Sequence, residues 1–157
     1  MARLHTLQTS MTLARPRAEV FAFFAAAENL ERITPPELKF SIVEAPPSGI
    51  RQGAIIRYRL RLAGVPFGWT TEISRWQPDR LFVDEQRRGP YAVWHHTHRF
   101  ADVQMPDGTT GTRIDDTVLW ALPLVPLGEI AAPIVAWQVA RIFAHRERAI
   151  RAIFDAR

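Results

Sequence analysis

The sequence predicts an α+β fold in which an antiparallel sheet packs against one long C-terminal helix. Between residues 38 and 122, segments that alternate apolar and polar residues follow one another with only turns between them. From Leu127 the apolar period becomes helical and stays helical to the end of the chain. Because no helices connect successive strands, the strands are expected to pair antiparallel.

One strand and two short helices precede the main run of strands. Residues 5–13 alternate in polarity, which predicts a half-buried strand. Apolar residues at helical spacing around Val20 and Phe24 predict a first short helix, and residues 28–33 predict a second. The second helix is expected to end at Thr34-Pro35-Pro36, since a residue before proline avoids the helical conformation.

Six further strands are separated by turns rich in Gly, Pro and Asp. In one of them, Arg57, Arg59 and Arg61 alternate with apolar residues, so the arginines are expected to face solvent. The six strands are predicted in residues 38–45, in GAIIRYRLRLAG (53–64), around Phe67 to Ile73, in 81–87, in the stretch after Pro90 through Phe100, and in TRIDDTVLWAL (112–122).

The final helix is predicted to run for about 25 residues, or about 40 Å. It carries a broad apolar stripe that must be buried, and the sheet is the large partner available. Trp137 is interpreted as a packing residue, with a lid or an interface as the alternative, and the run His145-Arg146-Glu147-Arg148 is assigned to the solvated side. The stripe consists of Ile130, Ile134, Val135, Val139, Ile142, Phe143, Ile150 and Ile153.

Composition narrows the functional classes. A chain of 157 residues, 47% hydrophobic and 23% charged, predicts a single soluble domain over residues 1–157, with a cytoplasmic location. The absence of cysteine excludes disulfides, thiolate catalysis and Cys-based zinc sites. The net charge of +4 comes from scattered arginines, so no nucleic-acid partner is expected. Residues 119–137 are apolar but contain three prolines and Glu129, so no integral membrane segment is expected.

Two of the three histidines in VWHHTHRF are predicted to face the interior. His96 and His98 are two residues apart on a strand, so they share a face with Trp94 and Phe100, whereas His95 points the other way. If the following hairpin turns near Asp107, the partners on the two strands have residue numbers that sum to about 214. The expected partners are then Phe100 and Ile114, His98 and Asp116, His96 and Val118, and Trp94 and Trp120.

The preceding strand is expected to add further polar groups to the same face. Phe82, Asp84 and Gln86 share one parity, and the turn at Gly89-Pro90 brings Asp84 near His96 or Trp94. Burying this many polar groups in a dry core would be costly unless they pair or are hydrated. The sequence therefore predicts a partly hydrated cavity between the sheet and the last helix.

Beyond these patterns, the chain resembles the bacterial SRPBCC, or START-like, superfamily of polyketide cyclase/dehydrase and lipid-transport type. The resemblance covers nearly the whole chain and is carried by EVFAFFAAAENLERITPP, GAIIRYRLRLAGVPFGWTTEISRWQPDR, FVDEQRRGPYAVWHHTHRF and GTRIDDTVLWALPLVPLG. It implies a helix-grip fold: a seven-stranded antiparallel sheet wrapped around a long C-terminal helix, two short helices after strand 1, and an enclosed hydrophobic cavity. The residues that match the pattern are Asp84, Gln86, Gly89, Pro90, Tyr91, Trp94, His96, His98, Phe100 and Asp116, with Trp120 as a following aromatic.

The expected function is binding of a small hydrophobic ligand, lipid-, polyketide- or aromatic-like, by a carrier or sensor. One alternative is a cyclase- or dehydratase-like enzyme that uses His and Asp groups of the same cavity as acid and base. A second is an interaction module for a partner enzyme. The candidate ligand-binding residues are Tyr58, Trp69, Asp84, Gln86, Trp94, His96, His98, Asp116, Val118, Trp120, Val139 and Phe143.

No cofactor, metal or catalytic residue is assigned. His96 and His98 with a carboxylate could bind zinc or iron, but two histidines at this spacing are common on strands, and pairing with Asp84 and Asp116 explains them. No serine or threonine is placed as a nucleophile, and no glycine-rich phosphate loop is present. Enzymatic activity therefore stays open at this point.

Overall fold

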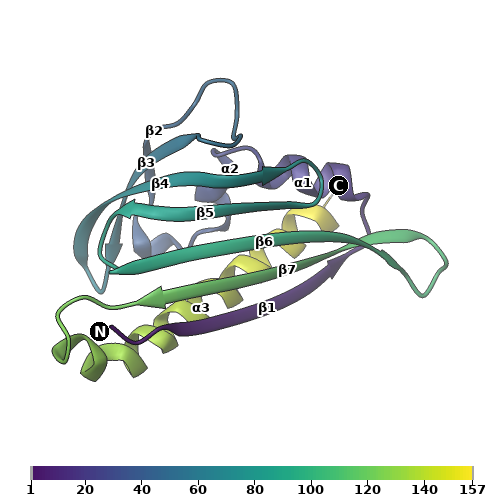
Figure 1. Cartoon of the computed structure of the whole chain (residues 1–157). Helices are drawn as coiled ribbons and strands as arrows, with labels where there is room; N and C mark the ends of the chain where they lie inside the picture. The colour runs from purple at the N-terminus through teal and green to yellow at the C-terminus, as the bar shows by residue number, and fades with distance from the viewer. Residues whose placement is uncertain (1, 157) are drawn as a thin grey trace.

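The computed structural model describes residues 2–156. A seven-stranded antiparallel sheet, in the order β1-β7-β6-β5-β4-β3-β2, curves around the long helix α3 (Figure 1). This is the helix-grip architecture expected from the sequence, with two short helices after β1. The elements are β1 (His5–Leu13), α1 (Arg17–Phe24), α2 (Asn29–Ile33), η1 (Pro36–Leu38), β2 (Ser41–Glu44), β3 (Ile55–Leu62), β4 (Val65–Gln77), β5 (Leu81–Arg88), β6 (Val93–Gln104), β7 (Thr110–Ala121) and α3 (Leu127–Asp155).

The strand register that positions the candidate site is confirmed. In the β6–β7 hairpin, His98 lies opposite Asp116 and His96 lies opposite Val118. On the other side of β6, Asp84 of β5 lies opposite His96. Because side chains alternate along each strand, this register turns His96, His98, Asp84 and Asp116 toward the concave face of the sheet.

The second strand is shorter than expected. A strand was predicted over residues 38–45, but Pro36–Leu38 forms the 3₁₀ turn η1 and β2 covers only Ser41–Glu44. Between them Lys39 adopts a left-handed conformation, with φ of 48°, which ends the turn and redirects the chain. The turn places Leu38 against the interior, where it lines the cavity described below.

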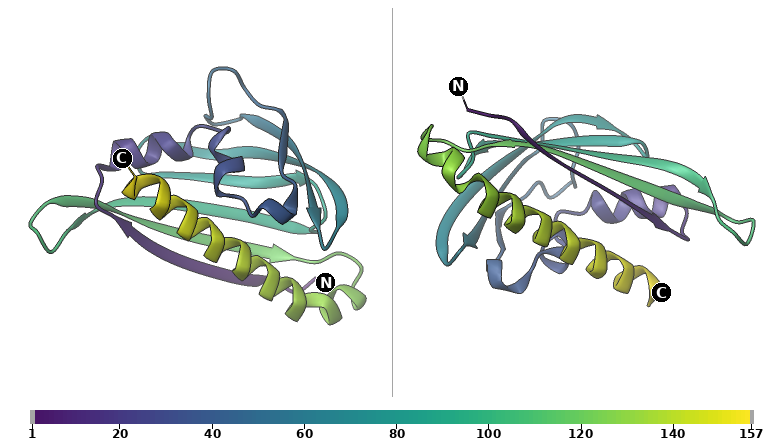
Figure 2. Two further views of the ribbon diagram at one scale, coloured as in Figure 1. Left: turned by 180° about the vertical axis from the view of Figure 1, so that it is seen from behind. Right: turned by 90° about the horizontal axis from the view of Figure 1, so that it is seen from below.

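Helix α3 lies along the concave side of the sheet (Figure 2). Val139, Phe143 and Ile150 are buried, as expected from the apolar stripe. Ile130 and Ile134, however, are 75% and 71% exposed, so the stripe prediction is wrong at these two positions. In this part of α3 it is Ala132 that is buried, so the apolar stripe is wider than the face in contact with the protein.

Trp137 is also exposed, which corrects its interpretation as a packing residue. Its ring contacts Arg141, whose guanidinium carbon lies 5.6 Å from the ring centre. Together with neighbouring apolar residues it forms an exposed surface that we term the apolar ridge. The ridge comprises Leu124, Val125, Leu127, Ile130, Ile134 and Trp137.

Among the described residues, α3 is the one helix long and apolar enough to cross a membrane, judged by length and composition alone. Core helices of soluble proteins meet the same two criteria, so a single such helix is weak evidence for a span. The expectation of no integral membrane segment stays a prediction.

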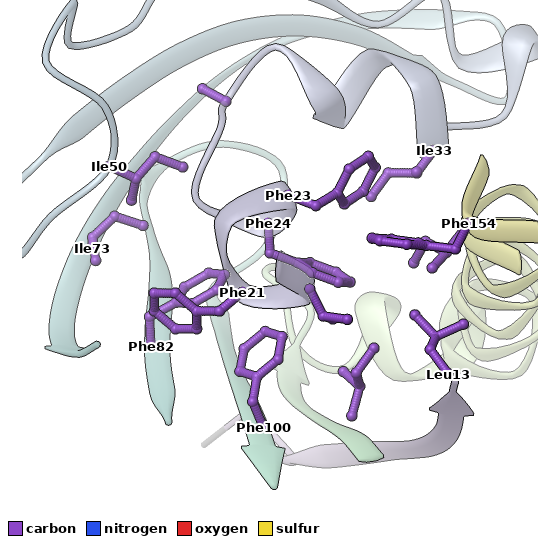
Figure 3. Close-up of a cluster of buried hydrophobic side chains, with 14 of the residues drawn as sticks. Leu13, Phe21, Phe23, Phe24, Ile33, Ile50, Ile73, Phe82, Phe100 and Phe154 are labelled. Atoms are coloured by element: carbon purple, nitrogen blue, oxygen red, sulfur yellow. The ribbon is translucent and has the colours of Figure 1, made fainter. Parts of the chain in front are cut away.

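The part of the core beneath α1 is built from phenylalanine (Figure 3). The rings of Phe21 and Phe100 meet edge to face with centres 5.1 Å apart, and those of Phe23 and Phe154 meet similarly at 5.2 Å. These contacts attach α1 to both β6 and the end of α3. We term the six residues the phenylalanine cluster: Phe21, Phe23, Phe24, Phe82, Phe100 and Phe154.

Candidate functional site

A cavity of about 150 Å³ lies between the concave face of the sheet and α3. One water molecule occupies about 30 Å³ in the liquid, so the space exceeds what one or two waters would need. A cavity is therefore present at the predicted place, between the sheet and the last helix. Its lining is mostly apolar: Phe24, Leu30, Ile33, Leu38, Phe40, Ile50, Ile56, Leu60, Leu62, Ile73, Phe82, Val139, Ile142 and Phe143. The remaining residues of the lining have polar atoms or an indole: Thr34, Tyr58, Trp69, Thr71, Asp84, Tyr91, Trp94, His96, His98 and Arg146.

The two histidines and two aspartates form a cross-linked quartet. His96 Nε2 is hydrogen-bonded to Asp116 Oδ1 at 2.8 Å, and His98 Nε2 is hydrogen-bonded to Asp84 Oδ2 at 2.6 Å. Each histidine also approaches the other carboxylate. His98 Nδ1 lies 2.9 Å from Asp116 Oδ1, and His96 Nδ1 lies 3.4 Å from Asp84 Oδ2. The shorter His98 contact lacks hydrogen-bond geometry, so it is a charge contact rather than a hydrogen bond.

This arrangement differs in one respect from the sequence-based expectation. Asp116 was expected to orient one ring nitrogen of His98 and to leave the other facing the cavity. In the structure, both nitrogens of His98 lie within 2.9 Å of a carboxylate oxygen. A register gives the direct partner of each residue, but side chains on three adjacent strands can also reach diagonally, and here both strands beside β6 supply an aspartate.

The quartet is held between aromatic rings. The ring of His98 stacks on Phe82 with centres 4.1 Å apart, and His96 meets the edge of Phe143 at 5.2 Å. The two imidazole rings themselves are 3.7 Å apart. Phe143 comes from α3, so the quartet is in contact with both the sheet and the helix.

Burial and pairing act in opposite directions on the pKa values of the quartet. Burial is the largest influence on Asp116 and would raise its pKa, but the hydrogen bond from His96 and the charge contact with His98 outweigh it and hold the pKa well below 3.8. For Asp84, burial is likewise outweighed by both histidines and by the charge of Arg146, so its pKa is lowered. Both aspartates are therefore ionised at neutral pH.

The two histidines respond differently. Burial, the largest influence, together with the nearby charge of His98, lowers the pKa of His96 below 6.5 despite the two aspartates. For His98, burial would also lower the pKa, but the close contact with Asp116 and the hydrogen bond and charge of Asp84 prevail and raise it. At a pH between these two pKa values, His96 is neutral and His98 is charged. With Arg146 as a second cation, the two negative and two positive charges balance.

Eight of the twelve predicted ligand-binding residues line the cavity: Tyr58, Trp69, Asp84, Trp94, His96, His98, Val139 and Phe143. The other four do not line it, and each has another structural role. Asp116, on the neighbouring strand β7, contacts both histidines. Val118, two residues further along β7, is fully buried. Trp120 stacks on His5 with ring centres 4.3 Å apart.

Gln86, the fourth, fixes the turn between β5 and β6. Its side-chain amide donates to the carbonyl of Tyr91 at 2.7 Å, and its oxygen accepts from the Tyr91 amide at 3.2 Å. A side chain at Gly89 would meet the Gln86 side chain, so a larger residue there would displace Gln86 from these hydrogen bonds. Gln86 therefore positions Tyr91, which lines the cavity, and does not face the cavity itself.

Tyr58, Trp69, Tyr91 and Trp94 form an aromatic wall at one end of the cavity. Trp69 stacks on Tyr58 with ring centres 5.8 Å apart and meets Trp94 edge-on at 5.3 Å. The Tyr58 hydroxyl lies 3.3 Å from the Thr71 hydroxyl. Burial raises the pKa of Tyr91 to about 12 and that of Tyr58 further, so both phenols are neutral. The Trp69 Nε1–H is buried without a partner among the described residues.

Arg146 is the main residue that the sequence-based reasoning missed. It was assigned to the solvated side of the last helix, but it lines the cavity, and its Nε and Nη2 atoms are buried. A signal was present, because Arg146 follows Phe143 by three residues and Ile142 by four, which places all three on one helix face. The charged neighbours of Arg146 instead favoured its assignment to the solvated side of the helix.

Asp84, His96 and His98 present ligand atoms that lie within 4.8 Å of one another, a set that a metal ion could share. The same atoms already form hydrogen-bonded His–Asp pairs. The expectation of no metal stays a prediction, which elemental analysis of the purified protein checks.

Comparisons with known proteins agree with this architecture. The family model described as "Domain of unknown function (DUF8410)" matches residues 32–154. The chain belongs to this family. A search of functionally curated proteins found no significant match.

Three solved structures illustrate the fold similarity. A START superfamily protein from Mycobacterium smegmatis has a TM-score of 0.65 and 15% identity over 97% of this chain and 98% of that chain. The Zhui aromatase/cyclase from Streptomyces sp. R1128 has a TM-score of 0.66 and 20% identity over 96% of each chain. Ginseng major latex-like protein 151 from Panax ginseng has a TM-score of 0.63 and 9% identity over 96% of this chain and 97% of that chain. The chain thus has the helix-grip fold of the START/SRPBCC superfamily.

Proposed function

We propose that the protein binds a small, largely apolar ligand in the cavity between the sheet and α3, as a carrier or sensor. The observation that carries this proposal is a mostly apolar cavity with a few polar groups at fixed positions. Ligand sites in proteins have this composition, in which apolar walls supply affinity and polar atoms supply orientation. The fold similarity to a START protein and to an aromatase/cyclase is consistent with it.

The size of the cavity limits the ligand. Sites for drug-sized molecules measure about 300–1,000 Å³, whereas a cavity of about 150 Å³ in another protein holds a molecule the size of benzene. The cavity described here is about 150 Å³. We therefore expect the bound part of the ligand to be about the size of one ring.

The geometry favours binding over acid–base catalysis. A catalytic base needs a nitrogen that can reach the substrate proton. All four imidazole nitrogens of His96 and His98 lie within 3.4 Å of a carboxylate oxygen. The histidines and aspartates of the quartet therefore pair with one another rather than with a substrate. A cyclase- or dehydratase-like activity has less support.

The proposal is tested with benzyl alcohol as a neutral probe, titrated while the methyl signals of the protein are followed by NMR. Binding in the cavity should shift the Val139 methyl signals, which line it, and leave those of exposed Ile134 unchanged. Leu60→Trp should abolish these shifts, because Leu60 projects into the cavity from β3.

Ile55→Trp is the matched control. It adds the same ring system to the same strand, but Ile55 has the opposite parity and is exposed on the outer face. Thermal unfolding of both variants establishes that they fold. Unchanged Val139 signals in the wild-type protein, or equal shifts in both variants, would refute the proposed site.

A further inference from the structure

Arg146 carries buried donors that the protein leaves unused. Its Nε and Nη2 atoms have no hydrogen-bond partner among the described residues, and Arg146 forms no ion pair within residues 2–156. An unsatisfied buried donor is costly, and the cost is larger for a charged group. Native proteins satisfy most buried polar groups, so this exception calls for an explanation.

The position of the guanidinium is fixed by the rings around it. Its central carbon lies 5.2 Å from the ring centre of Phe24 and 5.7 Å from that of Phe143. Both phenylalanines line the same cavity as Arg146. Cation–π contacts favour the charge at this place but satisfy none of its N–H donors, which point along the plane of the group.

The carboxylates nearby do not take up these donors. Asp84 and Asp116 each accept a hydrogen bond from a histidine instead. The charge of Arg146 acts on Asp84 from a distance without a direct ion pair. The guanidinium is therefore available to a group that enters the cavity.

A second unused donor lines the same cavity. The buried Trp69 Nε1–H also lacks a partner among the described residues. Both unused groups are donors only, so the complementary ligand must supply acceptors. Arginine binds carboxylates through two parallel hydrogen bonds, and such charge-assisted bonds are about twice as strong as neutral ones.

We propose that the ligand of this cavity is a small carboxylic acid with an apolar body about the size of one ring, and that Arg146 binds its carboxylate. This inference rests on the ligand-binding function proposed above and specifies its chemistry. The apolar body lies against the aliphatic and aromatic lining, and the carboxylate occupies the unused donors of the guanidinium.

The test compares benzoate with benzyl alcohol, which share a ring and one attached carbon but differ in charge. Wild-type protein should bind benzoate more tightly than benzyl alcohol by about tenfold or more, as one charge-assisted hydrogen bond implies. Arg146→Met should remove this advantage, so that the ratio of the two affinities falls to about one. Arg146→Lys keeps the cation without the planar group and should restore part of the benzoate affinity.

Arg148→Met is the matched control, because Arg148 is an exposed arginine on the same helix. It should change neither affinity. Equal loss of both probes in Arg146→Met would mean a purely structural role for Arg146 and would overturn the inference. So would binding of benzyl alcohol without any preference for benzoate, an outcome that leaves the proposed function intact. If neither probe binds, the proposed function fails and this inference fails with it.

Discussion

The two ends of the core use different kinds of aromatic residue. Around α1 the rings are mainly phenylalanines, which carry no polar atom and meet largely edge to face, with Trp76 packed against Phe21. At the other end the rings are Tyr58 of β3, Trp69 of β4, Tyr91 of the β5–β6 turn and Trp94 of β6, each with a hydroxyl or an N–H. Phenylalanine can fill space completely, whereas Tyr and Trp need a partner when buried. The first end is suited to stability, and the second is suited to contact with a ligand.

The quartet lies where these two ends meet. His98 stacks on Phe82 of the phenylalanine cluster, and His96 contacts Phe143, which lines the cavity from α3. The quartet therefore contacts both the phenylalanine cluster and the lining of the cavity. The following predictions separate the contributions of the two ends to stability and to binding.

The largest effect is expected in the closed core. Phe21→Ala removes a ring that contacts Trp76, Phe82 and Phe100 and should lower the free energy of unfolding by about 3–5 kcal/mol, measured by urea denaturation. Since Phe21 does not line the cavity, the remaining folded protein should bind benzyl alcohol within about twofold of the wild-type affinity.

Phe21→Leu serves as its control, because it keeps most of the volume and should lose only about 1 kcal/mol. A large drop in the affinity of folded Phe21→Ala for benzyl alcohol would show that packing around α1 also determines ligand binding. The two ends of the core would then not have separate roles.

An intermediate effect is expected at the quartet. Asp116→Asn keeps an oxygen that can accept from His96 but removes the charge, and should cost about 2 kcal/mol near pH 5. Asp116 and Asp84 raise the pKa of His98, so the pKa of His98 should fall in the variant, as followed by NMR of its ring proton.

The pH dependence of this cost follows from the two shifts. Asp116 has a lowered pKa, so its contribution is present above about pH 4 and is lost as the pH falls through its folded value. His98 has a raised pKa, so its contribution is complete below about pH 6.5 and is lost as the pH rises through its folded value. The difference between wild type and Asp116→Asn should therefore be largest between about pH 4 and 6.5. An equal difference at pH about 5 and about 9 would contradict the pairing of charged His98 with Asp116.

Much of this site could be predicted from the sequence because strands have a period of two. The turn at Pro106-Asp107-Gly108 fixed the hairpin, and the register then placed His98 opposite Asp116 and brought Asp84 to the same face. The diagonal pairing could not be predicted in this way. Which carboxylate each histidine reaches depends on side-chain rotamers and sheet curvature, and neither is visible in a pattern of residues.

Helix α3 was harder to predict for a related reason. A helical pattern shows which residues share a face, but it does not show how much of that face is covered. Ile134 was expected inside and is exposed, whereas Arg146 was expected outside and has buried nitrogens. The long stem of arginine allows its charged end to reach a position that polarity alone would assign to an apolar residue.

The smallest effect is expected on the apolar ridge, which marks the limit of the core on α3. Ile134 is 71% exposed, so Ile134→Gln should change the free energy of unfolding by less than about 0.5 kcal/mol in urea denaturation. Val139→Ala, five residues further along the same helix, removes methyl groups from a fully buried side chain and should cost several times more. Because exposed side chains have little to lose on unfolding, a loss at Ile134 comparable to that at Val139 would show that the ridge is covered in solution. The boundary between core and surface on α3 would then have to be moved outward to include it.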